Sequence, residues 1–321
     1  MRALKIIAIV IFAFVHAAIL HAQDSASVGA TKARCIIGLS DIKRNTNGRL
    51  SIGAGELTFE TKTHRSTIPI TSIENIYVGS ETTDAGGFVG EAARSVAAAA
   101  PYDTGAVLVI LMREKIDVLS LTYRDAEGGL HAAIFAMAKD RGQMLRSNLI
   151  AGGIRSMARK AQGMGEIPLP NYGNTLEASD RLQKPTPALR VEPVAPGSNI
   201  PAEYRLAIYE DVVERLQRSG LYRRVYRSEE SASDNDPNLQ SLVMAVDQFK
   251  QGSQTLRELT LILGATKVTM HLSLNQLGGE SLLDTKTTGR VLFFGENLDV
   301  TRDAAKHVFK VVRKMHRKPN V

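Results

Sequence analysis

The sequence predicts an α+β protein in which a mainly antiparallel β domain precedes a second domain of helices packed on a mostly antiparallel sheet. Three observations support this prediction. Seven of the eleven prolines lie between Pro168 and Pro201, in a stretch with neither a helical nor a strand period, which is typical of a linker. Before this stretch, apolar residues largely alternate with polar ones, as in strands. After it, two segments repeat apolar residues about every four positions, as in helices.

Residues 1–22 have the pattern of a secretory signal peptide. Arg2 and Lys5 precede an uncharged run from Ile6 to Leu20, and Ala22 ends a permissible cleavage site. A membrane-spanning helix needs about 20 apolar residues, so this run is short for an anchor, although an uncleaved N-terminal anchor is the alternative. The sequence therefore predicts an exported protein that is periplasmic or associated with the cell envelope.

The rest of the chain divides at the proline-rich stretch. We expect a barrel domain over residues 30–160, a linker over 161–186 and an α+β domain over 187–318. Hydrophobic residues make up 44% and charged residues 23% of the sequence, which is ordinary for packed globular domains. The formal net charge of +7 permits only mild attraction to anionic surfaces.

The first domain is expected to consist of strands followed by one helix. Alternating apolar residues predict strands within 48–61 and 66–79, and three longer apolar runs follow. Short polar segments at 113–115 and 125–129 separate those runs and indicate hairpin connections. The helical pattern over 139–159 predicts the final helix of the domain.

This order of elements resembles the pleckstrin-homology-like (PH-like) family, including its bacterial and GRAM-type members. The resemblance rests on "GELTFET", then "IPITSIENIYVG", a meander and a closing helix, and it covers residues 35–160. It implies a bent antiparallel barrel with one helix plugging an open end. Relative to the simplest members of the family, Thr82 to Thr104 is an insertion.

The insertion carries Gly86, Gly87 and Gly90 ahead of an alanine-rich helix, which raises the question of a phosphate-binding loop. A dinucleotide motif separates its first two glycines by one residue, and a P-loop requires Lys-Ser/Thr where Glu91 follows Gly90. We therefore expect no nucleotide site. The helix is predicted to dock on the barrel or on a partner through a smooth face of Val89, Ala92, Ala93, Val96, Ala97 and Ala100.

The second domain is expected to open with a strand over 188–194 and a helix that begins near Pro201, with Ser198 and Asn199 as potential caps. Glu210 and Asp211 are expected on a solvated face of that helix. Further strands and a last helix over 299–318 follow. The apolar face of the first helix is predicted to consist of Tyr204, Ile208, Val212 and Leu216.

The second domain resembles an uncharacterised family of bacterial envelope domains that often occur on lipoproteins. The resemblance spans most of residues 187–315 and implies an envelope location and an α+β fold, but no chemistry. The chain departs from this family in lacking a lipidation cysteine. Cys35 is the only cysteine, and we expect it to be a buried small hydrophobe rather than a reactive thiol.

Catalytic, metal and cofactor motifs are absent from the sequence. No two histidines after the signal have the i, i+4 spacing of a helical metal site, and no G-x-S-x-G turn occurs. His131 and His271 are expected to be packed or hydrogen-bonded residues. The chain has no tryptophan and only 5% aromatic residues, so stacking on nucleic acid is poorly supported. We expect no cofactor, no metal, no nucleotide and no nucleic-acid partner.

The C-terminal helix is the best functional candidate. Its basic residues would attract anionic lipid headgroups, at about 1 kcal/mol for each residue near such a surface. Alternatively, positive residues simply suit a helix C-terminus, which needs no partner. The apolar stripe opposite them is Ala305, Val308, Val312 and Met315. The candidate contact residues are Lys306, Lys310, Arg313, Lys314, Arg317 and Lys318.

The leading functional hypothesis is a non-enzymatic, exported bacterial envelope protein that binds or scaffolds envelope proteins or anionic lipid surfaces. One alternative is an envelope hydrolase whose site is assembled only in three dimensions, which a deep pocket with a histidine or paired carboxylates of shifted pKa would favour. A second alternative is a structural subunit of an envelope assembly, which a large exposed apolar patch would favour.

Overall fold

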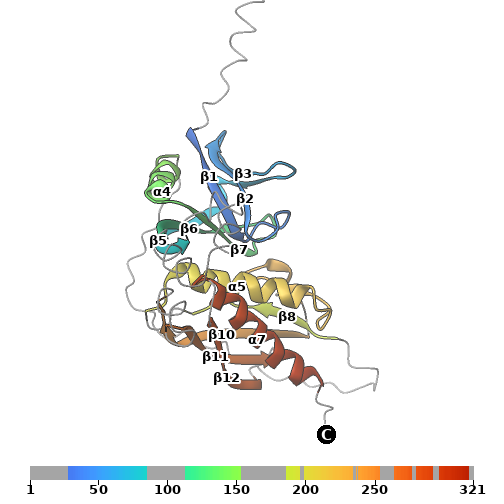
Figure 1. Ribbon diagram of the computed structural model, residues 1–321. Helices are drawn as coiled ribbons and strands as arrows, with labels where there is room; N and C mark the ends of the chain where they lie inside the picture. Colours follow the sequence, from blue (N-terminus) through green and yellow to red (C-terminus); the bar gives the residue numbers. More distant parts are fainter. Residues whose placement is uncertain are drawn as a thin grey trace, which may run out of the picture.

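The computed structural model describes residues 28–84, 113–152, 186–195, 199–233, 236, 238–253, 264–276, 280–291 and 296–317. These residues form two sheets and three α-helices (Figure 1), so the predicted α+β class is confirmed. The expected signal peptide, the proposed docking face of the insertion and nearly all of the expected linker lie outside the described residues.

The first sheet contains seven strands, all paired in antiparallel fashion. Their order is β4-β3-β2-β1-β7-β6-β5, so β4 and β5 form the edges. No pairing joins these edges in the described residues, and the closed barrel expected from the sequence is not found there. Pro69 ends β4, and a 3-10 turn over Ile70–Ser72 follows. The chain then continues as β5, which pairs with β6 rather than with β4. The strands are β1 (Val28–Ile37), β2 (Thr46–Gly53), β3 (Glu56–Glu60), β4 (Arg65–Pro69), β5 (Ile73–Asp84), β6 (Arg113–Arg124) and β7 (Leu130–Ala138).

The central strands of this sheet are buried on both faces. In β7, Phe135 and Met137 belong to a core within the first sheet, whereas Ile134 and Ala136 belong to a core shared with the second sheet. Side chains alternate between the two faces of a strand, so the uninterrupted apolar run of β7 supplies both cores.

The hairpin expected at residues 113–115 is wrong, because these residues belong to β6. That strand begins at Arg113, opposite Asp84 of β5, while β7 reaches only as far as Ile116. Residues 113–115 therefore pair with β5 alone, and Lys115 is exposed to solvent. Charged residues are tolerated in a strand segment that has a partner on one side only.

The hairpin expected at residues 125–129 is confirmed. Arg124 pairs with Leu130, and Asp125 Oδ1 accepts hydrogen bonds from the backbone N–H groups of Glu127 and Gly129. The helix expected next is α4 (Arg141–Ala151), which begins after this sheet. Buried Asp117 of β6 accepts a 2.9 Å hydrogen bond from the N–H of Gly142 and thereby caps the helix from the sheet.

The second sheet has five strands in the order β12-β11-β10-β8-β9. The strands β10, β11 and β12 form an antiparallel meander, whereas β8 pairs in parallel with both β10 and β9. The strands are β8 (Ala188–Val191), β9 (Val225–Tyr226), β10 (Leu239–Lys250), β11 (Thr266–Gln276) and β12 (Ser281–Val291). The helices that accompany them are α5 (Ala202–Gln217) and α7 (Asp299–Arg317).

Helix α5 lies between the two sheets (Figure 1). All four residues of its predicted apolar face are fully or almost fully buried, as expected. The solvated face expected for Glu210 and Asp211 is wrong, since these side chains are 3% and 1% exposed. The single apolar stripe of α5 predicted that only one side of the helix would be covered. In the structure, the first sheet also covers the side that carries Glu210 and Asp211. Pro201 occupies the N-cap position, and no side chain caps the helix.

Helix α7 packs against β12 and α5. The predicted apolar stripe is confirmed, because Ala305, Val308 and Val312 are completely buried. Gly289 of β12 permits this packing: a Cβ atom at that position would lie 2.6 Å from the backbone nitrogen of Ala304. The helix is therefore seated directly on the strand backbone.

Candidate functional site

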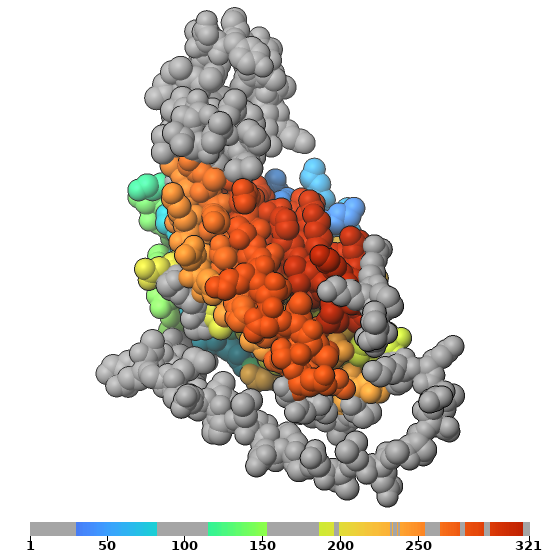
Figure 2. All heavy atoms as spheres, turned by 90° about the horizontal axis from the view of Figure 1, so that it is seen from below, coloured from blue at the N-terminus to red at the C-terminus, as the bar shows by residue number. Residues whose placement is uncertain are grey.

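The outer side of α7 carries a row of basic side chains. Lys306, Lys310 and Lys314 are exposed and follow one another at intervals of four residues, which places them on one side of the helix. Exposed Arg302 extends the row by one turn toward the N-terminus of the helix. Arg302 was not among the contact residues predicted from the sequence, although its i, i+4 relation to Lys306 was a readable signal. In Figure 2, the red atoms of α7 lie at the surface beside the orange strands of the second sheet.

The remaining predicted basic residues differ from this row. Arg313 is half-buried, with its guanidinium 5.5 Å from the centroid of the Phe309 ring, so it also covers apolar surface. Arg317 ends α7, and its side chain lies outside the described part of the chain, as does the whole of Lys318.

No acidic side chain in the described residues forms an ion pair with the row of Arg302, Lys306, Lys310 and Lys314. The positive charge also extends toward α5. Partial burial, followed by the repulsion of Arg302, lowers the pKa of Arg215 on that helix. The surface where α5 and α7 meet therefore combines several positive charges, of which the nearby Glu214 and Asp303 offset only a part at Arg215.

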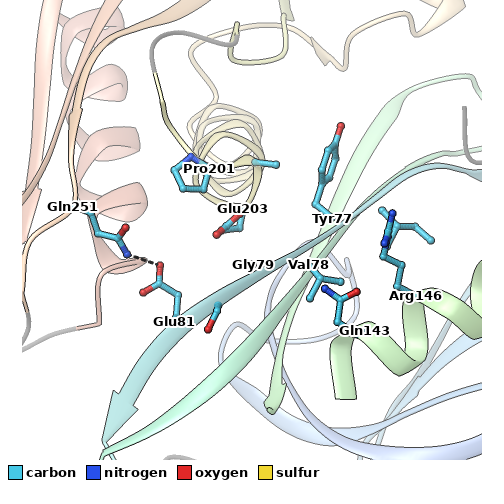
Figure 3. Close-up of a pocket in the computed structure, with 12 residues that line it drawn as sticks. Tyr77, Val78, Gly79, Glu81, Gln143, Arg146, Pro201, Glu203 and Gln251 are labelled. Carbon is cyan, nitrogen blue, oxygen red and sulfur yellow. Dashed lines mark hydrogen bonds between the residues drawn. The ribbon is translucent and has the colours of Figure 1, made fainter. Parts of the chain in front are cut away.

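A pocket of about 540 Å³ opens on a different part of the molecule. It is bounded by the β5 edge, by Gln143 and Arg146 of α4, by the start of α5 and by Gln251, which follows β10 (Figure 3). Two acidic residues, Glu81 of β5 and Glu203 of α5, line it. This pocket was not predicted from the sequence, because its walls come from segments far apart in the chain.

Glu81 is buried and fully hydrogen-bonded. Its carboxylate accepts hydrogen bonds from Tyr204 Oη at 2.5 Å, from Gln251 Nε2 at 3.2 Å and from Asn297 Nδ2 at 3.2 Å. Burial raises the pKa of Glu81, and the negative charge of Glu296 raises it further. The three donors oppose this shift and hold the carboxylate in place.

Glu203 occupies the first turn of α5 and is 5% exposed. Its carboxylate lies against Gly79 of β5, so closely that a side chain at position 79 would collide with it. Burial raises the pKa of Glu203, and the neighbouring charge of Glu81 raises it further. No lysine, arginine or histidine in the described residues forms an ion pair with this carboxylate.

The single cysteine is buried, and the two strand histidines contact neighbouring side chains. Cys35 is free and completely buried, and burial raises the pKa of its thiol to about 12. His131 stacks on Tyr123 and lies 2.9 Å from Asp125, and His271 lies 2.6 Å from Asp284. The predictions for these three residues are confirmed. Within the described ranges, no group of three or more Cys, His, Asp and Glu residues is arranged to hold a metal ion.

Among the helices in the described part of the chain, none is long and apolar enough to cross a membrane.

The described molecule is thus an α+β protein with a basic helix face and a separate acidic pocket. No protein-family model and no curated protein matches the chain. Among solved structures, the PelC dodecamer from Paraburkholderia phytofirmans aligns with 44% of this chain and 96% of its own, at 14% identity and a TM-score of 0.32. A single-residue variant of the same dodecamer covers the same shares at 16% identity and a TM-score of 0.30. Scores this low do not establish a shared fold or function.

Proposed function

We propose that this chain is a non-enzymatic, exported envelope protein that attaches to anionic lipid surfaces through α7. The observation that carries the proposal is the exposed row of Arg302, Lys306, Lys310 and Lys314, which forms no ion pair with an acidic side chain in the described residues. Each basic residue close to an anionic bilayer contributes about 1 kcal/mol of binding free energy. Together, four such residues contribute about 4 kcal/mol, which corresponds to weak, reversible attachment with a Kd of about 1 mM.

Two further observations support the proposal. The first 22 residues have the charge and apolar pattern of an export signal, which would deliver the protein to the envelope. The seven-stranded antiparallel sheet followed by one helix is compatible with the proposed PH-like resemblance of the first half. The resemblance of the second half to envelope domains likewise stays a prediction.

The proposal is tested by sedimentation with vesicles of phosphatidylglycerol and phosphatidylcholine. We expect the triple variant Lys306→Gln, Lys310→Gln and Lys314→Gln to bind about 100-fold more weakly, because three charges correspond to about 3 kcal/mol. Substitution is a sharper test than truncation, since removing α7 would also remove Val308 and Val312 from the core.

The matched control neutralises three exposed lysines outside α7, by Lys32→Gln, Lys43→Gln and Lys139→Gln. This variant has the same net charge as the first and should bind almost as well as the unmodified protein. An equal loss in both variants would show that net charge, rather than the α7 face, drives attachment. Unchanged binding of the α7 variant would contradict the proposal outright.

A hydrolase is the second candidate, because Glu81 and Glu203 line one pocket and burial raises the pKa of both. Two carboxylates are the usual catalytic pair in glycoside hydrolysis. However, both oxygens of Glu81 are engaged by hydrogen-bond donors, which leaves Glu203 as the one carboxylate free to act. A screen of chromogenic glycosides tests this candidate, and turnover that Glu203→Gln abolishes would establish it.

A further inference from the structure

We propose that the pocket between β5, α4 and the start of α5 binds a small molecule bearing an ammonium or guanidinium group, with Glu203 as its counter-ion. This proposal does not depend on α7 or on attachment to lipid. It rests on the burial of Glu203, the charge of Glu81 and the composition of the pocket walls.

Glu203 is buried without an ion pair, and only its own backbone N–H and the charge of Arg205 partly offset the cost of burying its carboxylate. Its side chain is more than nine-tenths buried, and its described surroundings provide no ion pair. Burying an uncompensated charge is unfavourable, so proteins normally pair such a group or neutralise it. The carboxylate lines an accessible pocket, where a ligand can provide the missing positive charge (Figure 3).

Glu81 makes the same end of the pocket more negative. Its three hydrogen-bond donors are neutral groups from Tyr204, Gln251 and Asn297, so they fix its position without cancelling its charge. The charge of Glu81 disfavours ionisation of Glu203. A cation between the strand and the helix would reverse this unfavourable interaction and stabilise the ionised form of both groups.

The walls of the pocket fit an organic cation better than a bare metal ion. Its volume of about 540 Å³ is within the range of small-molecule sites. Ile76, Tyr77 and Val78 line it and can contact an aliphatic stem. Strand β5 is also at the edge of its sheet, and its outer backbone groups have no strand partner in the described part of the chain. Carbonyl oxygens on that edge can accept N–H groups from the ligand.

Arg146 lies in the wall of the pocket that α4 contributes. The described chain places no carboxylate in ion-pair distance of it. A ligand with a carboxylate in addition to its amine would therefore find a partner there. Arginine and agmatine differ only by that carboxylate, so the two probes separate an amino acid from a simple amine.

The test is calorimetric titration of the full chain with agmatine, arginine and succinate at constant ionic strength. We expect saturable binding of agmatine, no binding of the dianion succinate, and at least about tenfold weaker agmatine binding in Glu203→Gln. Glu214→Gln is the matched control, because Glu214 is on the same helix but pairs with Arg218 outside the pocket. This control should bind agmatine as the unmodified protein does.

A measurement on the unmodified protein complements the variant. Affinity for agmatine should decrease as the pH is lowered, because protonation of Glu203 removes the counter-ion. The other charged or titratable groups close to this carboxylate or lining the pocket are Glu81, Arg205, Arg146 and Tyr77.

If arginine binds more tightly than agmatine, and Arg146→Gln abolishes this difference, the proposal is supported with an amino acid as the ligand. Equal binding of arginine and agmatine would support it with a simple amine. The proposal is overturned if neither cation binds saturably, if Glu203→Gln binds agmatine with unchanged affinity, or if the affinity is independent of pH. None of these results bears on vesicle attachment through α7.

Discussion

Glu210 and Arg227 form a buried, bidentate ion pair beside the first sheet. Arg227 Nη1 and Nη2 lie 2.8 and 2.9 Å from the two carboxylate oxygens of Glu210. The same groups also bind the backbone of β7: Glu210 accepts the N–H of Ala132 at 2.6 Å, and Arg227 donates to the carbonyl of Leu130 at 3.0 Å. Burial on its own lowers the pKa of Arg227, but the charge and the hydrogen bonds of Glu210, together with the smaller effects of Tyr209 and Tyr123, outweigh burial and raise this pKa.

Removal of Arg227 should be strongly destabilising. Arg227→Met leaves Glu210 buried without its counter-ion, and we expect the free energy of unfolding to decrease by about 3–5 kcal/mol. The measurement is urea denaturation at neutral pH. Glu214→Gln breaks the exposed pair with Arg218 on the same helix and should cost less than about 1 kcal/mol. Similar losses in the two variants would contradict the assigned role of burial.

Glu203 should also make stability depend on pH. Its pKa in the folded chain is raised above the ordinary value of 4.5, so the folded chain binds more protons than the unfolded chain just above that pH. The free energy of unfolding that Glu203 contributes therefore falls as the pH rises from 4.5 to its folded pKa, and is constant above it.

The substitution Glu203→Gln removes this pH-dependent decrease in the free energy of unfolding. We expect the variant to be more stable than the unmodified protein by an amount that grows with pH above 4.5 and then levels off. Chemical denaturation at several pH values measures the difference. A difference that is independent of pH would show that Glu203 has the same pKa in the folded and unfolded chains.

At the scale of single residues, the sequence predicted Cys35, His131 and the buried face of α5 but misplaced Glu210 and Asp211. Carboxylates at neighbouring helix positions are usually solvated. The sequence around Glu210 and Asp211 does not indicate which distant arginine will pair with each of them. Asp211 is paired with Arg44, which lies far earlier in the chain. Such pairs depend on tertiary contacts, which a helical period does not encode.

At the scale of elements, the seating of α7 on β12 depends on the absence of a side chain at Gly289. Gly289→Ala would place a methyl group within 2.7 Å of three atoms of Ala304. Because two of those atoms belong to the helix backbone, the helix has to shift, and we expect a loss of about 1–3 kcal/mol. Arg290→Ala is the control, since Arg290 is exposed on the same strand and should change stability by less than about 0.5 kcal/mol. Thermal denaturation of both variants measures the difference, and equal melting temperatures would contradict this packing role.

The elements themselves were largely predictable, whereas their extents and pairings were not. The meander of β10, β11 and β12 and the helices α5 and α7 follow from apolar periods of two and of about four. The error at residues 113–115 has a physical origin. Charged residues commonly mark turns, but here they occupy the end of β6 beyond the reach of β7, and Lys115 is exposed to solvent there.

At the scale of the molecule, the two halves share one hydrophobic core. Ile116, Val118 and Ile134 of the first sheet pack in the same cluster as residues of α5, α7 and the second sheet. Ion pairs between described residues also cross between the halves, among them Arg34 with Glu296, Arg44 with Asp211, Arg124 with Glu229 and Arg224 with Glu127. The proline-rich stretch indicated a boundary in the sequence, but it carried no information on how extensively the two sides pack.

The first half should therefore be unstable alone. We expect residues 23–160, produced without the remainder, to melt at a lower temperature than the full chain and to bind the dye ANS more strongly, because the face that covers α5 becomes exposed. Calorimetry and ANS fluorescence make the comparison. An isolated half with the melting temperature of the full chain and no dye binding would contradict the shared core.

The position of α5 between the sheets also has a consequence for the order of events in a living cell. A chain that emerges from its N-terminus completes β7 at Ala138 well before α5 begins at Ala202. During that interval, the face formed by Ile116, Val118 and Ile134 lacks the cover that α5 later provides. Vectorial synthesis therefore creates a period in which a chaperone can bind the half-finished protein, and the length of sequence between the two elements determines how long that period lasts.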